Sequence, residues 1–299
     1  MMAGMYAAIS GLDANQTMLD ETANDLANVN TVGYKAVSVT FADSLTQVFR
    51  GASGPTPTNG GTNPVQIGLG VQVGATINEM SEGSFQSTNN PLDVAIEGKG
   101  FLRVGPGAPK AEELTKNIPA NVSYTRAGDL TTNQAGFLTT QGGEYVVGRN
   151  AEVTAETETG NTYEPGKEDS YILIPPGSSN VSIGQDGSVS YTDENKESKT
   201  YLQRVTAGYL SLATFPNESG LERLGGSLWA RTTNSGAPIV NTPDTPGYGS
   251  TIGGELEMSN VDMATEMTNM ITAERGYQAN SRTITTADEM LGTLVSMVQ

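Results

Sequence analysis

Pairs of adjacent acidic residues are the side chains in this sequence whose type and spacing could do chemistry. They include Asp20-Glu21, Glu112-Glu113, Asp193-Glu194 and Asp288-Glu289. Where folding brings two carboxylates together, they can act as the acid and the base or nucleophile of glycoside hydrolysis. Most acidic pairs instead lie on solvated faces, so a carboxylate hydrolase is retained here only as an alternative.

Two short glycine patterns raise the question of nucleotide binding. They are Gly68-Leu69-Gly70 and Gly98-Lys99-Gly100. Neither completes the GxGxxG pattern or sits in a βαβ context, so we interpret these glycines as turn residues. No stretch has the spacing of a calcium-binding loop.

The sequence contains no histidine and no cysteine. This composition excludes disulfides, thiol nucleophiles, Cys/His zinc sites and the side chain most often used for proton transfer near neutral pH. Carboxylate or serine–lysine catalysis stays open in principle. We predict a protein that is not an enzyme and that uses no cofactor or metal.

The charge balance argues against polyanionic partners. The formal net charge is −17, from 33 acidic and 16 basic residues, and it would repel nucleic acid and anionic membranes. No run is long enough to span a bilayer, so we expect no membrane insertion. The first basic residue is Lys35, with Asp13 and Asp20 before it, which is not the pattern of a cleavable secretory signal.

Both ends of the chain show helical periodicity. Apolar residues recur at steps of three and four from Met5 to Leu26 and again from Met263 to Val298. We expect the first helix to end near Gly33, a common C-terminal stop. We expect the second to run from about residue 260 to 298, opened by a capping box at Ser259 and Asp262.

These periodic residues define a predicted self-assembly seam. A dozen such side chains, at about 1.5 to 3 kcal/mol each, fall short of the backbone entropy lost over nearly forty helical residues, so the helices should need partners. An antiparallel hairpin of the two ends or a dimeric coiled coil remains an alternative. The seam consists of Met5, Ile9, Leu12, Leu19, Leu26, Met263, Met267, Met270, Tyr277, Ile284, Leu291, Leu294 and Val298.

Between the helices the sequence favours strands and turns. Residues 40–64 read as an extended linker, and short apolar runs after them are separated by turn residues, as in an antiparallel β domain. The clearest hairpin turn is Asp186-Gly187, whereas the acidic, Thr-rich residues 151–167 are predicted to form a surface loop.

The predicted fold class is α+β. Long N- and C-terminal helices are packed as a coiled-coil-like pair, with a central antiparallel β domain and an extended linker. We place the boundaries at 1–34 for the N-terminal helix, 35–74 for the linker, 75–254 for the β-rich outer domain and 255–299 for the C-terminal helix.

Both ends also resemble the rod, hook and hook-associated family of flagellar axial proteins. SGLDANQTMLDETANDLANVNTVGYKA, residues 10–36, is similar to its N-terminal signature, and LEMSNVDMATEMTNMITAERGYQANSRTITTADEMLGTL, residues 256–294, resembles its C-terminal motif. The family commonly has phenylalanine where this chain has Tyr34, and glutamine where it has Glu274, so these two residues are mild departures from its pattern. FRGASGPTPTNGGTNPVQIGLGVQV, residues 49–73, looks more like hook proteins than distal rod proteins, although the chain is short for a hook protein.

The resemblance implies a structural subunit of the tubular flagellar hook. Such a subunit self-assembles into a helical polymer that transmits torque as a flexible joint between rod and filament and encloses the export channel. Its partners would be further copies, the distal rod protein, the hook cap, the hook–filament junction proteins and the type III export apparatus. It would be extracellular, in the hook and basal body, and exported without a cleavable signal. The alternatives are a distal rod subunit or, in another class, a secreted β-rich glycan-binding or hydrolytic protein.

Overall fold

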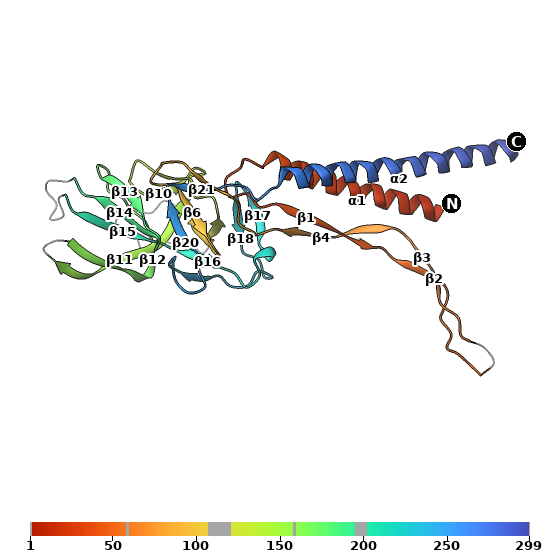
Figure 1. The fold of residues 1–299 in the computed structure, drawn as a ribbon, viewed down its shortest axis with the longest axis horizontal. Coiled ribbons are helices and arrows are strands. Elements are labelled where there is room, and N and C mark those ends of the chain that lie inside the picture. The colour runs from red at the N-terminus through yellow and green to blue at the C-terminus, as the bar shows by residue number, and fades with distance from the viewer. Residues whose placement is uncertain (1, 58–59, 107–120, 158–159, 195–201, 299) are drawn as a thin grey trace. The chain divides into compact units, whose positions relative to one another are not determined.

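The computed structural model describes residues 2–57, 60–106, 121–157, 160–194 and 202–298 (Figure 1). They fall into two compact units. The helical unit contains the chain up to Val29, Ala36–Glu79 and the chain from Val261 onward. The β unit contains Asn30–Lys35 and Met80–Asn260.

The helical unit is built on helix α1 (Met2–Ala27) and helix α2 (Met263–Val298). The two lie side by side and run antiparallel (Figure 1). The predicted α+β class is therefore confirmed, while the coiled-coil geometry of the pair stays a prediction. Neither helix in the described part of the chain has a stretch long and apolar enough to cross a membrane.

The helix boundaries differ from the predicted ones at both connections. Helix α1 ends at Ala27 rather than near Gly33, because the β-branched and Asn residues that follow are poor helix formers. Helix α2 is capped by Asp262, whose carboxylate accepts hydrogen bonds from Ala264 N at 3.1 Å and Thr265 Oγ1 at 2.7 Å. These bonds, with that from Thr265 the larger influence, lower the pKa of Asp262. The predicted cap at Ser259 is wrong, since Ser259 lies four residues before Met263, where α2 begins.

The segment predicted as an extended linker forms a two-stranded ribbon. Strand β1 (Val37–Asp43) pairs with β4 (Val71–Asn78), and β2 (Thr46–Arg50) pairs with β3 (Val65–Gly68), both antiparallel. The chain is extended here, as expected, but alternating β-branched and apolar residues allow it to pair with itself. All described side chains of β2 and β3 are exposed.

The β unit carries the remaining strands. They are β5 (Phe85–Ser87), β6 (Val94–Glu97), β7 (Phe101–Gly105), β8 (Ser123–Thr125), β9 (Leu130–Thr132), β10 (Leu138–Thr140), β11 (Tyr145–Thr157), β12 (Gly160–Tyr171), β13 (Ser179–Ile183), β14 (Ser188–Thr192), β15 (Arg204–Leu210), β16 (Leu212–Thr214), β17 (Glu222–Gly225), β18 (Leu228–Ala230), β19 (Ile239–Asn241), β20 (Ser250–Gly253) and β21 (Glu255–Glu257), with one 3-10 turn at Glu218–Gly220.

Most of these strands join one antiparallel sheet, whose main path is β13-β14-β15-β11-β7-β8-β18-β17. Strands β20 and β21 pair separately with β6 and β5. The core gathers the alternate apolar residues of these strands, among them Val94, Leu102, Val104, Leu210 and Leu212. A second cluster stacks Tyr124 edge-on against Phe215, with ring centroids 4.8 Å apart.

Two local predictions in this unit had opposite outcomes. The Asp186-Gly187 turn is confirmed, since Gly187 has a φ of 76° and joins β13 to β14. The loop predicted over residues 151–167 is wrong, because β11 and β12 pair along this stretch from Val147↔Tyr171 to Thr157↔Gly160. Its threonines favour strands, and the pairing gives a polar sequence a regular backbone partner.

Candidate functional site

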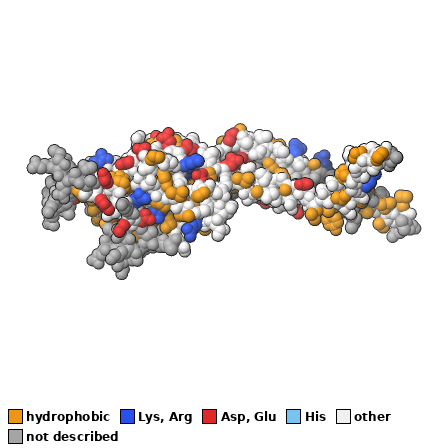
Figure 2. Space-filling model, turned by 90° about the horizontal axis from the view of Figure 1, so that it is seen from below, with side chains coloured by type: hydrophobic (Ala, Val, Ile, Leu, Met, Phe, Trp, Pro, Cys, Tyr) orange, Lys and Arg blue, Asp and Glu red, His pale blue; other side chains and the backbone are white. Residues whose placement is uncertain are grey.

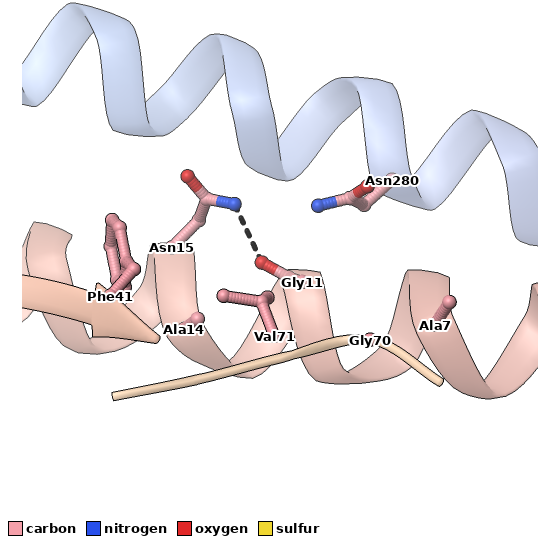
Figure 3. A pocket seen from close by; sticks show the side chains of 8 residues that line it. All are labelled: Ala7, Gly11, Ala14, Asn15, Phe41, Gly70, Val71 and Asn280. Carbon is pink, nitrogen blue, oxygen red and sulfur yellow. Dashed lines mark hydrogen bonds between the residues drawn. The ribbon is translucent and has the colours of Figure 1, made fainter. Parts of the chain in front are cut away.

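Two Gly–Asn pairs fit together where α1 and α2 meet. A Cβ at Gly11 would lie 2.6 Å from Asn280 Nδ2, and a Cβ at Gly276 would lie 2.5 Å from Asn15 Oδ1. Asn15 Nδ2 also donates to the Gly11 carbonyl at 2.6 Å (Figure 3). Each asparagine therefore fills the space left by a glycine on the opposite helix, and the backbones can approach closely at this level.

The side chains buried in the two helices are small or polar. On α1 they are Ala8, Ala14, Thr22 and Asp25, and on α2 they are Ala273 and Ala287. On α1, the buried residues Ala8 and Asp25 each come one residue before a predicted seam position, Ile9 and Leu26 respectively. The pair of helices thus uses its small residues for its own contact.

The predicted seam residues are not buried within the described part of the chain. Met5, Leu12, Leu19, Leu26, Met270, Tyr277 and Ile284 are half-buried. Ile9, Met263, Met267, Leu291 and Leu294 are exposed, and the side chain of Val298 lies outside the described residues. The periodicity did not single out Tyr6, Ile271 or Val295, which are exposed as well. The role of the seam in assembly remains a prediction.

The ribbon rests on α1 through close backbone approaches. Ser10 Oγ accepts from Val71 N at 3.2 Å, and Gly70 leaves no room for a Cβ against the same hydroxyl. Asp25, fully buried in the last turns of α1, accepts from Val37 N at 2.9 Å. Polar groups on α1 thus fix the ribbon near both ends of the β1–β4 ladder.

A pocket of about 380 Å³ opens between α1, α2 and the ribbon. Its lining, drawn in Figure 3, consists of Ala7, Gly11, Ala14, Asn15, Phe41, Gly70, Val71 and Asn280. None of these residues is charged. Small residues leave the space for the pocket, and the two asparagine amides provide side-chain hydrogen-bonding groups in its lining.

In the β unit, a buried ion-pair network holds the connector, which is the segment Asn30–Lys35 that follows α1. Lys35 Nζ lies 2.6 Å from Glu257 Oε1, and neither side chain is exposed. Arg126 Nη1 lies 3.2 Å from Glu257 Oε2, with its side chain 3% exposed. Burial lowers the pKa of Lys35, and the Glu257 carboxylate opposes this shift. Two cations around one carboxylate make Glu257 the central group.

Backbone atoms complete this network. Lys35 Nζ donates to the Ser81 carbonyl at 2.7 Å, and Arg126 Nη2 donates to the Gly98 carbonyl at 2.7 Å. Gly83 N donates to Glu257 Oε1 at 3.1 Å. Buried charges are tolerated when they are paired and hydrogen-bonded in this way. The network joins the connector to β21, the strand that precedes α2.

The neighbouring connector residues are also fixed in place. Gly33 has a φ of 65°, and its N–H donates to the Glu257 carbonyl at 2.8 Å. The guanidinium of Arg223 lies between the rings of Tyr34 and Trp229, 4.9 and 5.0 Å from their centroids. The sequence pointed to Gly33 as a helix stop, to Tyr34 as a departure from the family pattern and to Lys35 as the first basic residue. Their partners were missed, because no local pattern links residues about 200 positions apart.

The acidic pairs considered for catalysis do not form a described site. Asp20, Asp288 and Glu289 are exposed on the helices, and Glu194 is exposed in the β unit. Glu112 and Glu113 lie outside the described residues. Among the residues that the structure describes, no cluster of acidic side chains could hold a metal ion.

Comparison with known protein families gives three matches along the chain. Residues 5–35 match the family described as flagella basal body rod protein, and residues 95–191 match the flagellar hook protein FlgE/F/G D1 domain. Residues 252–297 match the flagellar basal body rod FlgEFG protein C-terminal family. The first match covers most of α1, and the last covers nearly all of α2.

The individual relatives are likewise flagellar rod and hook proteins. The chain is 40% identical to the flagellar basal-body rod protein FlgG of Bacillus subtilis, with 99% of each chain covered. It is 36% identical to the protein of the same name from Agrobacterium fabrum, with 97% of each covered. Similarity to the flagellar hook protein FlgE of Borreliella burgdorferi is 26% over 440 aligned positions, covering 99% of this chain and all of the relative.

Proposed function

This chain belongs to the family of flagellar basal-body rod and hook proteins, and we propose that within this family it is a distal rod subunit that assembles into a rigid tube. As a member, it is a structural subunit of the flagellar axis. Beyond this membership, we propose that it assembles in the rod rather than in the hook, that the assembly is a tube, and which partners it contacts.

The relatives support the rod in preference to the hook predicted from residues 49–73. The two rod proteins align with nearly the whole chain, and with nearly the whole of themselves, at 40% and 36% identity. The hook protein needs 440 aligned positions against the 299 residues of this chain, at 26% identity. The hook-like segment is short, and a local likeness of this kind weighs less than a match over the full length.

Exposed apolar side chains on the terminal helices are the observation that carries the proposal. Met263 and Met267 are each 51% exposed, and Ile9 is 43% exposed. Covering the exposed half of such a side chain with a neighbouring copy would contribute about 0.7 to 1.5 kcal/mol, half of what burying a fully exposed one contributes. Because the small-residue stripe already joins α1 to α2, the large residues are available for other copies.

The buried network in the β unit suits a rigid shaft. Torque applied to one copy has to pass along the connector without unfolding it. Lys35, Tyr34 and Gly33 are each held by separate contacts in the β unit. Breaking a buried ion pair costs about 3 to 5 kcal/mol, so this connector resists being pulled away from its strands.

The same proposal includes the route and the neighbours. Such a subunit leaves the cell through the flagellar type III export apparatus, joins copies of itself and adjacent axial proteins, and encloses the channel through which later subunits pass. These partners follow from membership of the family and the proposed place in the rod.

Electron microscopy of the purified chain, concentrated until it assembles, tests the proposal. Straight, rigid tubes are the expected result. Curved or polymorphic tubes would favour the hook instead. Monomers that persist at high concentration would contradict both and would favour a secreted β-rich glycan-binding or hydrolytic protein.

A further inference from the structure

We propose that the C-terminal end of α2 in one copy docks into the pocket between α1, α2 and the ribbon of a neighbouring copy. The inserted segment is residues 290–298, called the overhang below. The inference rests on the proposed self-assembly and specifies one contact within it.

The register of the two helices produces the overhang. Gly11 faces Asn280 and Asn15 faces Gly276, so facing residues have numbers that add up to 291. Met2, the first described residue of α1, is therefore level with residue 289. Helix α2 continues to Val298, and its last two turns have no α1 residue opposite them.

The overhang is apolar and uncovered. Its sequence from Met290 to Gln299 contains no charged residue. Leu294 is 46% exposed, Val295 63% and Met297 81%. Every described side chain from residue 288 to 297 is exposed. An isolated helical end of this composition gains stability only by packing against something else.

The pocket has matching properties. Its volume of about 380 Å³ equals roughly a dozen waters at about 30 Å³ each, which is room for more than one large side chain. Phe41 is 43% exposed at this site. The side-chain amide of Asn280 has no hydrogen-bond partner among the described residues, so it can bond to the hydroxyls of Thr293 or Ser296 that flank the apolar residues of the overhang.

Charge favours this pairing over others. The chain carries a net charge of −17, so most surfaces of two copies repel each other or would have to bury charged groups on contact. The lining of the pocket and the overhang are both uncharged. They can meet without removing a charged side chain from water.

Helix geometry gives the displacement between the two copies. Leu294 lies 14 residues beyond Asn280, which is about 21 Å along a helix. If the helices of neighbouring copies are parallel, a shift of about 20 Å along their axis would bring the overhang of one level with the pocket of the other. The same distance keeps Leu294 from reaching the pocket of its own chain.

Disulfide trapping tests the contact directly, because the natural chain has no cysteine. The variant with Val71→Cys and Leu294→Cys is assembled and oxidised. The two cysteines of one chain are too far apart to bond to each other, so the expected product is a ladder of covalently linked copies on a non-reducing gel. The control pairs Val71→Cys with Glu274→Cys, an exposed residue of α2 that the same shift leaves about 9 to 12 Å along the axis from the pocket of either copy, and should give no ladder.

A second variant covers the case in which the cysteine variant fails to assemble. Asn280→Asp adds one carboxylate at the pocket and should raise the critical concentration for assembly about tenfold, equivalent to about 1.4 kcal/mol. Asn89→Asp, the same change at an exposed turn of the β unit, should leave it unchanged.

The outcomes separate this inference from the proposed function. Tubes without a ladder, or tubes that tolerate Asn280→Asp as well as Asn89→Asp, would overturn the overhang contact and leave the rod proposal standing. A natural chain that forms no polymer would contradict the rod proposal itself.

Discussion

Gly11 of α1 and Asn280 of α2 occupy one shared space, with the amide of Asn280 where a Cβ of residue 11 would stand. Gly276 and Asn15 repeat the arrangement one turn away. These contacts set the register of the helical unit, and they leave larger apolar side chains such as Met263 and Met267 exposed.

Gly11→Ala should weaken the helix pair. The new methyl group would lie 2.6 Å from Asn280 Nδ2, and overpacking of this kind costs about 1 to 3 kcal/mol. The measurement is the loss of helical circular dichroism on heating the assembled protein. Gly4→Ala is the control, because a Cβ there meets nothing within 4 Å and should stabilise the helix by up to about 1 kcal/mol. Asn280→Ala should rescue Gly11→Ala, and equal effects of the two glycine changes would contradict the shared space.

Glu257→Gln should destabilise the β unit more than Lys35→Met does. The first change leaves Lys35 and Arg126 buried without a carboxylate, whereas the second leaves the Arg126–Glu257 pair intact. We expect a loss of about 3 to 5 kcal/mol for Glu257→Gln. Urea unfolding can be followed by the fluorescence of Trp229, the single tryptophan of the chain, which is 3% exposed. Glu255→Gln on the same strand serves as the control and should change little.

Gly33→Ala should destabilise the docked connector for two reasons. Residue 33 has a positive φ of 65°, and a Cβ there would lie 2.5 Å from the backbone nitrogen of Ala127. Gly226→Ala separates the two effects, since its φ is 60° with nothing within 4 Å. The control should lose about 1 to 2 kcal/mol from the conformation alone, and Gly33→Ala should lose clearly more in the same urea assay. Similar losses would mean that the connector moves away easily.

Mild acid should stabilise the helical unit through Glu266. Burial raises the pKa of this carboxyl, and the nearby carboxylates of Asp25, Glu79 and Asp262 raise it further. A raised pKa means that the folded unit binds the proton more tightly than the unfolded chain does. The contribution of Glu266 is therefore fully present below the unfolded pKa and is lost as the pH rises through the folded pKa.

Glu266→Gln should remove this part of the pH dependence. The variant should be more stable than the natural chain at pH 7, and the difference should shrink as the pH falls toward about 4.5. Thermal melts of the helical signal across this range measure it. Glu274→Gln, an exposed change on the same helix, controls for general loss of charge. A difference that grows as the pH falls would contradict the assigned direction.

The sequence predicted the two helices and the β unit but not which helical stripe the chain uses for itself. Periodicity reports that a stripe is apolar, and it cannot tell whether the partner is the same chain or another copy. On α1, the stripe containing Gly11 and Ala14 is buried while Ile9 is exposed. Small residues such as Gly11 weaken an isolated helix, yet here they allow the closest contact between α1 and α2.

Contacts between residues far apart in the chain could not be predicted from the sequence, for a different reason. Lys35 and Glu257 are separated by 222 positions, and each looks like an ordinary surface charge in its local context. The ribbon and the pairing of β11 with β12 were also not predicted. Pairing between strands supplies stability that the composition of either strand alone does not reveal.

Thiol labelling of Met267→Cys before and after assembly tests the central claim most directly. Met267 is 51% exposed in the single copy, and the cysteine would be the only thiol in the chain. Labelling should be fast in the monomer and strongly slowed in tubes, while Asp186→Cys in the exposed turn between β13 and β14 stays reactive. Equally fast labelling of residue 267 inside intact tubes would show that neighbouring copies do not cover the helices.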